Sequence, residues 1–388
     1  MDSRAFGVAS PLSLLLLGPL LLLGVSCRDG AASGGPVPPE APQIAPSSAT
    51  APVPAATTPP PDVAFLPERV AHEAQAMGTH LAFTAYTTRE VDAAKTKKLF
   101  EDAVTEIKRI ETLMTTWRPD SEVSRINAAA GKAPVKVGAE TLAVIKEALH
   151  TSEISEGTFD ITFEVLHGLW KFDEDLDPNP PTDAQIKSKL VLLGYKHVKV
   201  DVAASTVFLD KEGVKISLGG IAKGYAVDRA AKVLETGGLT AYFVQAGGDL
   251  YTHGKKPDGN DWQAGIRDPR GKDGSYFAML PVTDHAFSTA GDYERSYLKD
   301  GKRYHHIIDP RTGKPASASR SVTIWAPTAF QADAIDDAVF ILGPEKGLKL
   351  VESLEGVGAV IVDASNNLYV SKQLYGKLKI VAVPSDGP

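Results

Sequence analysis

Cysteine is nearly absent from this chain, because Cys27 is the only one in 388 residues. The rest of the chain therefore offers no thiol for a disulfide, for thiolate catalysis or for a cysteine-based zinc site. Basic charge is also scarce, since 41 Lys and Arg residues face 48 Asp and Glu residues and leave a formal net charge of -7. A chain with this balance has no basic field for nucleic acid, and we expect no nucleic-acid partner.

A long hydrophobic run is missing as well. The apolar stretch from Leu14 to Leu23 follows a short head with Arg4 and is too short for a comfortable membrane span. These are the features of the h-region of a signal peptide. The stretch leads into Gly-Val-Ser-Cys27, which resembles a bacterial lipobox, where the cysteine is lipidated and becomes the new N-terminus. We predict a lipoprotein signal peptide over residues 1–27, with a soluble secreted protein cleaved nearby as the alternative.

Residues 28–68 contain little that could form a core. Their composition shifts to Pro, Ala, Ser, Gly and Thr and includes Pro59-Pro60-Pro61. Such a segment buries too little apolar surface to fold, so we predict a disordered, semi-extended tether. Together with a lipidated Cys27, it would hold the following domain off a membrane surface.

Residues 69–388 have the patterns of one folded domain with helices and strands. Apolar residues at steps of three or four predict helices over 99–114, 142–149, 222–234 and 331–341, with another after Pro344. Strands are predicted over 81–86, 198–202, 206–209, 214–218, 241–245, 263–266, 278–282, 304–308, 321–326 and 358–362. Asp300-Gly301 marks a hairpin turn. This mixture predicts an α+β fold with largely antiparallel sheets, and the lack of a G-x-G-x-x-G after any strand argues against a Rossmann unit.

Three small-residue segments predict a site for a phosphate or pyrophosphate. Two glycine pairs follow predicted strands, and the first also opens a predicted helix, whose N-terminus favours negative charge. Each segment alone is explained equally well by a tight turn, but the three together favour an anion site. The candidate binding residues are Gly219, Gly220, Lys223, Gly247, Gly248, Asp249, Ser288, Thr289 and Gly291, followed by Asp292.

Residues 286–315 combine an acid, aromatic and cationic side chains and a histidine pair in thirty residues. Buried polar groups need partners, whereas the lining of a ligand site uses them directly, so this density favours a site. The alternative is a solvated hairpin in which His305 and His306 are ordinary strand residues. Neutral imidazole titrates near working pH, which makes His306 our candidate general base.

Carboxylates on the predicted helix 331–341 indicate a metal site. Asp333 and Asp337 are four residues apart and share one helix face, where they repel unless a cation lies between them or both point to water. Asp336 is also within reach. The apolar residues that follow make the segment core-like, which favours the metal over a solvated face. Oxygen-only ligands favour magnesium over zinc or copper.

The segment Ser288-Thr-Ala-Gly-Asp-Tyr-Glu-Arg295, followed by His305-His-Ile-Ile-Asp-Pro-Arg-Thr-Gly-Lys-Pro315, resembles the signature of the ApbE family, the FAD:protein FMN transferases. Further blocks that resemble the family lie at 77–79, 114–127, 157–162, 217–228 and 332–343, so the resemblance covers nearly the whole folded domain. It implies a single ApbE-like, T-fold-like catalytic domain. It also implies magnesium-dependent transfer of FMN from FAD to a Ser or Thr hydroxyl of an acceptor protein, with release of AMP.

The resemblance also implies roles for particular residues. The flavin-binding residues that it adds are Met77, Thr116, Trp117, Asp120, Ser121 and Asp160, whereas the local sequence around 117–121 indicates only a helix end, a turn and a new cap. The magnesium ligands that it implies are Asp333, Asp337 and the backbone carbonyl of Ala222. The family ordinarily has Thr at 337, and Asp keeps an oxygen ligand while adding negative charge.

Two other functions stay open at this point. An FAD pyrophosphatase would use water in place of the protein hydroxyl and release FMN and AMP, and a flavin-binding lipoprotein would carry FAD without chemistry. For the transferase, the resemblance implies an acceptor among electron-transport subunits, such as those of sodium-pumping NADH:quinone reductase and Rnf-type complexes. The expected location is the bacterial cell envelope, with the domain lipid-anchored to a membrane and facing the periplasm.

Overall fold

The computed structural model of the chain describes residues 64–172 and 176–387. The predicted signal peptide, Cys27 and nearly all of the predicted tether lie outside the described residues. The described residues form one compact unit. Among the described residues, no helix is long and apolar enough to cross a membrane.

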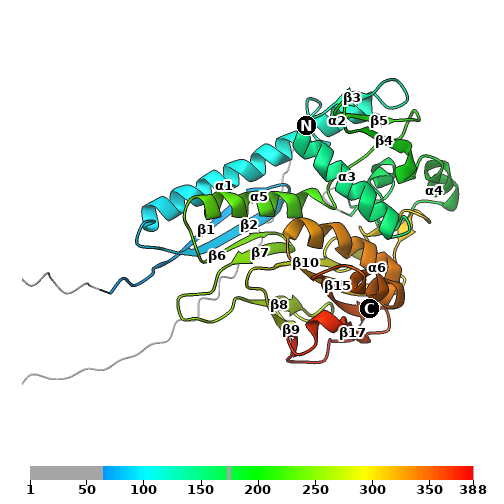
Figure 1. The fold of residues 1–388 in the computed structure, drawn as a ribbon. Coiled ribbons are helices and arrows are strands. Elements are labelled where there is room, and N and C mark those ends of the chain that lie inside the picture. The colour runs from blue at the N-terminus through cyan, green and yellow to red at the C-terminus, as the bar shows by residue number, and fades with distance from the viewer. Residues whose placement is uncertain (1–63, 173–175, 388) are drawn as a thin grey trace, which may run out of the picture. The chain divides into compact units, whose positions relative to one another are not determined.

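An eight-stranded sheet, here the main sheet, is the largest element of the fold (Figure 1). Its strand order is β1-β2-β6-β7-β10-β15-β16-β17, and each neighbouring pair is antiparallel. The strands are β1 (Arg69–Ala76), β2 (Thr79–Tyr86), β6 (Tyr242–Ala246), β7 (Asp249–His253), β10 (Ala286–Gly291), β15 (Ser319–Ala326), β16 (Gly358–Asp363) and β17 (Leu368–Val370).

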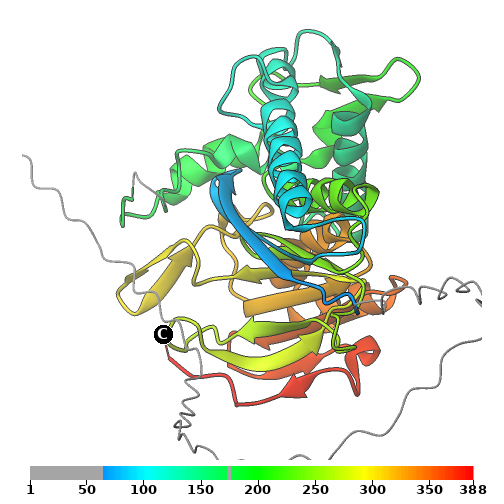
Figure 2. The ribbon, with the colours of Figure 1, turned by 90° about the vertical axis from the view of Figure 1, so that its left-hand side faces the viewer.

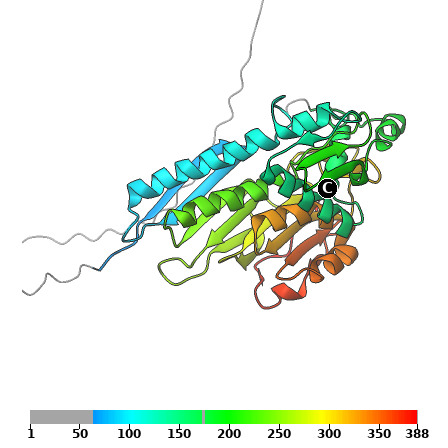
Figure 3. The same ribbon diagram turned by 45° about the horizontal axis from the view of Figure 1, so that its top comes forward.

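Three long helices cover one face of the main sheet (Figures 1 and 3). They are α1 (Ala93–Met114), α5 (Ala222–Thr236) and α6 (Ala329–Glu352). Their apolar faces and the inward side chains of the strands form the larger core, as the helical spacing of α1 predicts. Helix α6 is interrupted at Gly343, whose φ of 73° favours glycine, and Pro344 follows, so it contains the two predicted helical segments.

A small sheet covers the other face of the main sheet (Figure 2). It has the order β18-β9-β8 and consists of β8 (Gln263–Arg267), β9 (Tyr276–Pro281) and β18 (Lys379–Ile380). Phe277 of this sheet and Phe287 and Trp325 of the main sheet belong to a second buried apolar cluster. The main sheet is therefore buried on both faces, with helices on one side and strands on the other.

Apart from helix α3 (Ala139–Ile154), the remaining elements are short. They are the helices α2 (Glu122–Ala128), α3 (Ala139–Ile154) and α4 (Asp183–Leu190), the 3-10 helices η1 (Ile161–Leu166), η2 (Tyr195–His197) and η3 (Lys372–Leu374), a sheet of β3 (Val135–Lys136), β5 (Thr206–Leu209) and β4 (Val198–Asp201), and the pairs β11 (Ser296–Lys299) with β12 (Lys302–His305) and β13 (Ile308–Asp309) with β14 (Lys314–Pro315).

The predicted fold class is confirmed, since helices pack on largely antiparallel sheets. The hairpin turn at Asp300-Gly301 is also present, and both residues have positive φ, at 52° and 74°.

The predicted strand over 214–218 is wrong. Its residues alternate between buried and less buried, but the N–H of Ile216 bonds to the side chain of Asn127 and that of Ser217 to the carbonyl of Ile161. The predicted strand over 304–308 ends at His305, and β10 was not predicted.

Helices α5 and α6 approach each other closely at Gly224. A Cβ atom added there would overlap the carbonyl oxygen of Ala329 and lie 2.7 Å from Cβ of Asp333. Only glycine fits this crossing. The close approach brings the first turns of the two helices together, and with them the side chains described below.

Replacing Gly224 with Ala should lower the free energy of unfolding by about 1–3 kcal/mol, because the added methyl group must push the two helices apart. Urea unfolding followed by circular dichroism measures this change. The matched control is Lys232→Ala, at an exposed position of the same helix. A Gly224→Ala protein as stable as this control would show that the helix contact is not as tight as the structure indicates.

Candidate active site

Three buried carboxylates form a cluster where α6 meets the first turn of α5. Asp249 is the first residue of β7, and Asp333 and Asp336 project from α6. All three residues are buried, and one oxygen of each lies within 4.8 Å of the others. We call these residues the carboxylate cluster.

Each carboxylate of the cluster has partners that fix its position. The ammonium of Lys223, in the first turn of α5, lies 2.8 Å from Oδ2 of Asp249 and 3.0 Å from Oδ1 of Asp333. The backbone N–H of Gly224 donates to Oδ2 of Asp333 at 2.7 Å. The hydroxyl of Ser288, in β10, lies within hydrogen-bonding distance of Asp249 and of Oδ2 of Asp336, the latter at 2.7 Å. Because this hydroxyl has one proton, it can donate to only one of the two carboxylates.

Burial shapes the protonation of the cluster. Loss of solvent raises the pKa of Asp333 to about 7 and that of Asp336 well above its usual value, and the neighbouring carboxylates add to both shifts. Burial acts to lower the pKa of Lys223, but the charges of Asp249 and Asp333 outweigh it and raise that pKa. Three carboxylates thus face one ammonium in a dry site. Without a divalent cation, protons therefore offset part of the charge of the cluster, and its oxygen-only donor set fits a cation such as magnesium.

The predicted metal ligands are near one another but have different surroundings. Asp333 is in the carboxylate cluster, and Ala222 is buried one residue before Lys223. Asp337 lies beside the turn that precedes α5, since a Cβ atom on Gly220 would be 3.6 Å from its Oδ2. Asp336, noted only as within reach, belongs to the cluster. The spacing of three between Asp333 and Asp336 also places them on one helix face and could have indicated this.

The two glycine pairs lie next to the cluster. Gly219 and Gly220 lie in the turn before α5, where the N-cap residue Ile221 makes no side-chain capping bond and the N–H of Gly224 is instead bound by Asp333. Gly247 and Gly248 join β6 to β7 directly before Asp249, and Gly247 has a φ of 58°. The first junction therefore leads to Lys223 itself, and the second leads to Asp249, which contacts Lys223.

The β6–β7 turn packs closely against its neighbours. A Cβ atom on Gly247 would lie 2.6 Å from Oγ1 of Thr79, and one on Gly248 would lie 3.0 Å from the carbonyl oxygen of Thr289. Thr79 directly follows the tight β1–β2 turn, in which Met77 has a φ of 51° and Gly78 a φ of 67°. Met77 is therefore close in sequence to a residue that contacts the β6–β7 turn.

The predicted segment 288–291 is a strand of the main sheet and not a loop. It pairs with β15 along its whole length. Since neighbouring side chains of a strand point to opposite faces, Ser288 faces the helices and the carboxylate cluster, whereas Thr289 faces away and contacts Oγ1 of Thr323 at 2.9 Å. Only one side of this strand therefore contributes side chains to the cluster.

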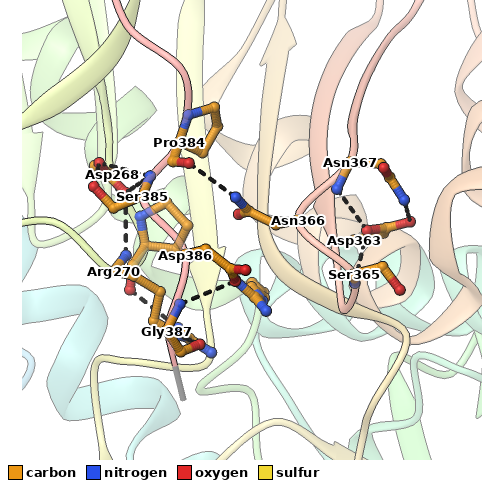
Figure 4. A network of polar contacts seen from close by, with 12 residues as sticks. Asp268, Arg270, Asp363, Ser365, Asn366, Asn367, Pro384, Ser385, Asp386 and Gly387 are labelled. Atoms are coloured by element: carbon orange, nitrogen blue, oxygen red, sulfur yellow. Dashed lines mark hydrogen bonds and ion pairs between the residues drawn. The ribbon is translucent and has the colours of Figure 1, made fainter.

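Asp292, which follows β10, is engaged in a buried ion pair. Its two oxygens each accept a hydrogen bond of 2.7 Å from the guanidinium of Arg270. Figure 4 shows Arg270 and Asp268 beside the C-terminal tail, where the backbone and hydroxyl of Ser385 donate to Asp268. These contacts explain Asp292 as an anchor of the strand end, and they occupy the oxygens that a ligand or a proton would need.

Residues of the predicted flavin-binding block have local partners. Ser121 caps α2, because its Oγ accepts from the N–H of Ser124 at 2.9 Å and donates to the carbonyl of Thr115 at 2.6 Å. The carbonyl of Thr116 accepts from the Ser124 hydroxyl, and Asp120 is exposed and paired with Arg118.

Trp117 and Asp160 differ in what they offer a ligand. Trp117 is 81% exposed and touches His167 edge-on, so much of its ring is accessible. Asp160 is buried and caps η1, where it accepts from the N–H and hydroxyl of Thr162 and from the N–H of Tyr195. The contacts of Asp160 are structural, whereas much of the ring surface of Trp117 is accessible to a ligand.

The two histidines of the signature segment have different environments. His305 is buried, and its Nδ1 accepts from the N–H of Ile307 while its Nε2 donates to the carbonyl of Ala316, as a neutral imidazole does. His306 follows β12, and among the described residues its buried Nδ1 has no hydrogen-bond partner. Burial, together with the charge of Arg295, lowers the pKa of His306 well below its usual value. His306 is therefore neutral near pH 7 and able to accept a proton.

The low pKa of His306 predicts a pH dependence of stability. Below about pH 6.5 the unfolded chain binds a proton at this position that the folded chain does not, so acid destabilises the fold by up to about 1.4 kcal/mol per pH unit through this group. Relative to His306→Gln, the parent should therefore lose unfolding free energy as the pH falls from about 7.5 to about 5.5. Urea unfolding at several pH values measures the difference. A constant difference would contradict the buried, neutral state of His306.

Buried carboxylates, a candidate base and glycine turns, one of them at a helix start, are the features of a site that could hold a divalent cation and a phosphate-containing ligand. Comparison with known proteins then identifies the family. The model of the ApbE family matches residues 77–361, and the chain belongs to this family.

Relatives and solved structures agree with this assignment. An FAD:protein FMN transferase of Klebsiella pneumoniae is 33% identical over 283 residues, which are 72% of this chain and 80% of the relative. The ApbE protein of Thermotoga maritima matches with a TM-score of 0.72 and 34% identity, over 80% of this chain and 99% of that one. The flavin transferase ApbE of Vibrio cholerae matches with a TM-score of 0.71 and 28% identity, over 80% of this chain and all of that one.

Proposed function

We propose that this chain is an FAD:protein FMN transferase. Its curated relatives carry this name, and the observation that carries the proposal is the buried carboxylate cluster, with Lys223 and two glycine turns beside it. In the proposed reaction, the hydroxyl of a Ser or Thr in an acceptor protein attacks the FMN-side phosphorus of FAD. The bond between that phosphorus and the bridging oxygen breaks, AMP leaves with the electron pair, and FMN remains in phosphoester linkage.

Magnesium is the metal that fits the site. We assign it to Asp333, which is common to the carboxylate cluster and to the set of Ala222, Asp333 and Asp337 that the family resemblance implies. Bound there, magnesium would offset the charge of the pyrophosphate and of the departing AMP. The Gly219–Gly220 turn at the start of α5 would donate backbone N–H groups to the same phosphates, and the helix dipole would favour their negative charge.

His306 is our candidate for the base that takes the proton of the acceptor hydroxyl. Its Nδ1 is buried without a partner among the described residues, and its pKa is low enough to keep the ring neutral. Asp292, the carboxylate that follows β10, is not available for this role because both of its oxygens are engaged by Arg270. For the flavin, Trp117 supplies the accessible ring face.

An assay of AMP release tests the proposed function. The full-length protein is incubated with FAD and magnesium, with and without a flavinylation acceptor. AMP release that depends on the acceptor, together with an acceptor that gains the mass of FMN, is the expected result. AMP release without acceptor would instead show an FAD pyrophosphatase, and no AMP under either condition would show a carrier.

A comparison of two substitutions tests the metal assignment. Asp333→Ala should lower FMN transfer by roughly a hundredfold or more, because a divalent cation supplies most of the charge stabilisation in phosphoryl transfer. Asp337→Thr restores the residue usual in the family and should retain activity. FMN transfer measured across magnesium concentrations checks both. Unchanged activity of Asp333→Ala would reject the metal site, and an inactive but folded Asp337→Thr would reject the family-derived ligand geometry.

Substitutions of the histidine pair test the candidate base. His306→Ala should still bind FAD but lose FMN transfer by roughly a hundredfold or more, the usual contribution of a general base, and His306→Gln should be nearly as slow. The neighbouring substitution His305→Ala serves as the control and should lower the rate of FMN transfer only slightly. A loss of FAD affinity in proportion to the rate would assign His306 to ground-state binding instead.

We further propose that the protein is anchored to a membrane through a lipid on Cys27 and faces the periplasm, where it modifies an electron-transport subunit. The lipobox-like segment and the Pro-rich residues that follow support the anchor. Cys27→Ser should leave the activity of the folded domain intact and release the protein from the membrane fraction. Persistence of this variant in washed membranes, with its signal peptide removed, would contradict the lipid anchor on Cys27.

A further inference from the structure

Lys223 lies where a bound cation would balance the carboxylate cluster. Its ammonium is 2.8 Å from Asp249 and 3.0 Å from Asp333, so it bridges carboxylates from two different elements. The side chains of Asp249 and Asp333 are only 2% and 3% exposed, whereas that of Lys223 is 29% exposed. The two carboxylates are therefore shielded from water, whereas the side chain of Lys223 reaches solvent and can leave the site.

A divalent cation and this ammonium cannot share the same oxygens. Magnesium binds carboxylate oxygens at short distances, so an ion on Oδ1 of Asp333 would lie within a few ångströms of the ammonium. Like charges at such a distance repel strongly where water is excluded. The ammonium must therefore move away when the ion enters.

The proposed anion site lies close to Lys223 in the chain. Lys223 is the second residue of α5, and the Gly219–Gly220 turn directly precedes this helix. An anion at this helix start would attract an ammonium that has lost its carboxylate partners. The lysine side chain is flexible enough to reach either partner.

We propose that Lys223 is an exchangeable counter-cation, which neutralises Asp249 and Asp333 until a divalent ion replaces it and then contacts the pyrophosphate of FAD. The identity of this anion rests on the proposed function. The exchange makes the binding of metal and FAD mutually dependent, since each ligand favours the same position of Lys223. By linkage, each ligand then strengthens the binding of the other.

The test is the affinity of the purified full-length protein for Mn²⁺, measured by electron paramagnetic resonance of the free ion. Without FAD, Lys223→Gln should bind Mn²⁺ about tenfold more tightly than the parent, because the competing ammonium is gone. The matched control Lys232→Gln, at an exposed position of the same helix, should bind as the parent does. Added FAD should tighten Mn²⁺ binding to the parent by a similar factor and to Lys223→Gln by much less.

Several outcomes would overturn the exchange. Equal or weaker Mn²⁺ binding by Lys223→Gln, or no binding by either protein, contradicts it.

Thermal unfolding provides a second readout, because Lys223→Gln should be less stable than the parent in chelator and should gain more stability from Mn²⁺. A variant that stays unfolded at saturating Mn²⁺ also contradicts the exchange. Failure of the proposed function is a separate result, since absence of FMN transfer would leave the Mn²⁺ comparison unaffected.

Discussion

The reciprocal contact between α5 and α6 is the interaction on which the site depends. The N–H of Gly224 in α5 binds the carboxylate of Asp333 in α6, and the carboxylate of Asp228 in α5 accepts the first N–H groups of α6, from Ala329 and Phe330, both at 2.9 Å. Each helix thus satisfies polar groups of the other. Because only glycine fits at 224, the helices approach closely enough to put Lys223 and Asp333 in contact.

The main sheet supplies the rest of the site from rigid positions. Asp249 starts β7 and Ser288 lies in β10, so both side chains are fixed by strands that are buried on two faces. Side chains on regular elements hold a geometry more tightly than side chains on loops. Such a scaffold can keep like charges close together in a dry site, because the fold and not the charges determines where they lie.

Local patterns in the sequence predicted the fold class and the main helices, but they did not predict which polar residues meet. Asp249 joins Asp333 and Asp336 only through packing between a strand and a helix that are far apart in the chain. The alternating pattern over 214–218 looks like a strand, yet it reflects burial without a neighbouring strand to pair with. Residues of the signature segment also have different roles. Ser288 contacts the carboxylate cluster, whereas Asp292 anchors the end of a strand through its ion pair with Arg270.

The most direct measurement of the central claim is the anomalous scattering of Mn²⁺ in crystals of the protein with FAD. The account predicts a manganese peak bonded to the carboxylate of Asp333 between α5 and α6, with the ammonium of Lys223 moved from Asp249 to the pyrophosphate. A peak away from Asp333 would contradict the metal site. A peak at Asp333 with Lys223 still bridging Asp249 and Asp333 would contradict the exchange of cations.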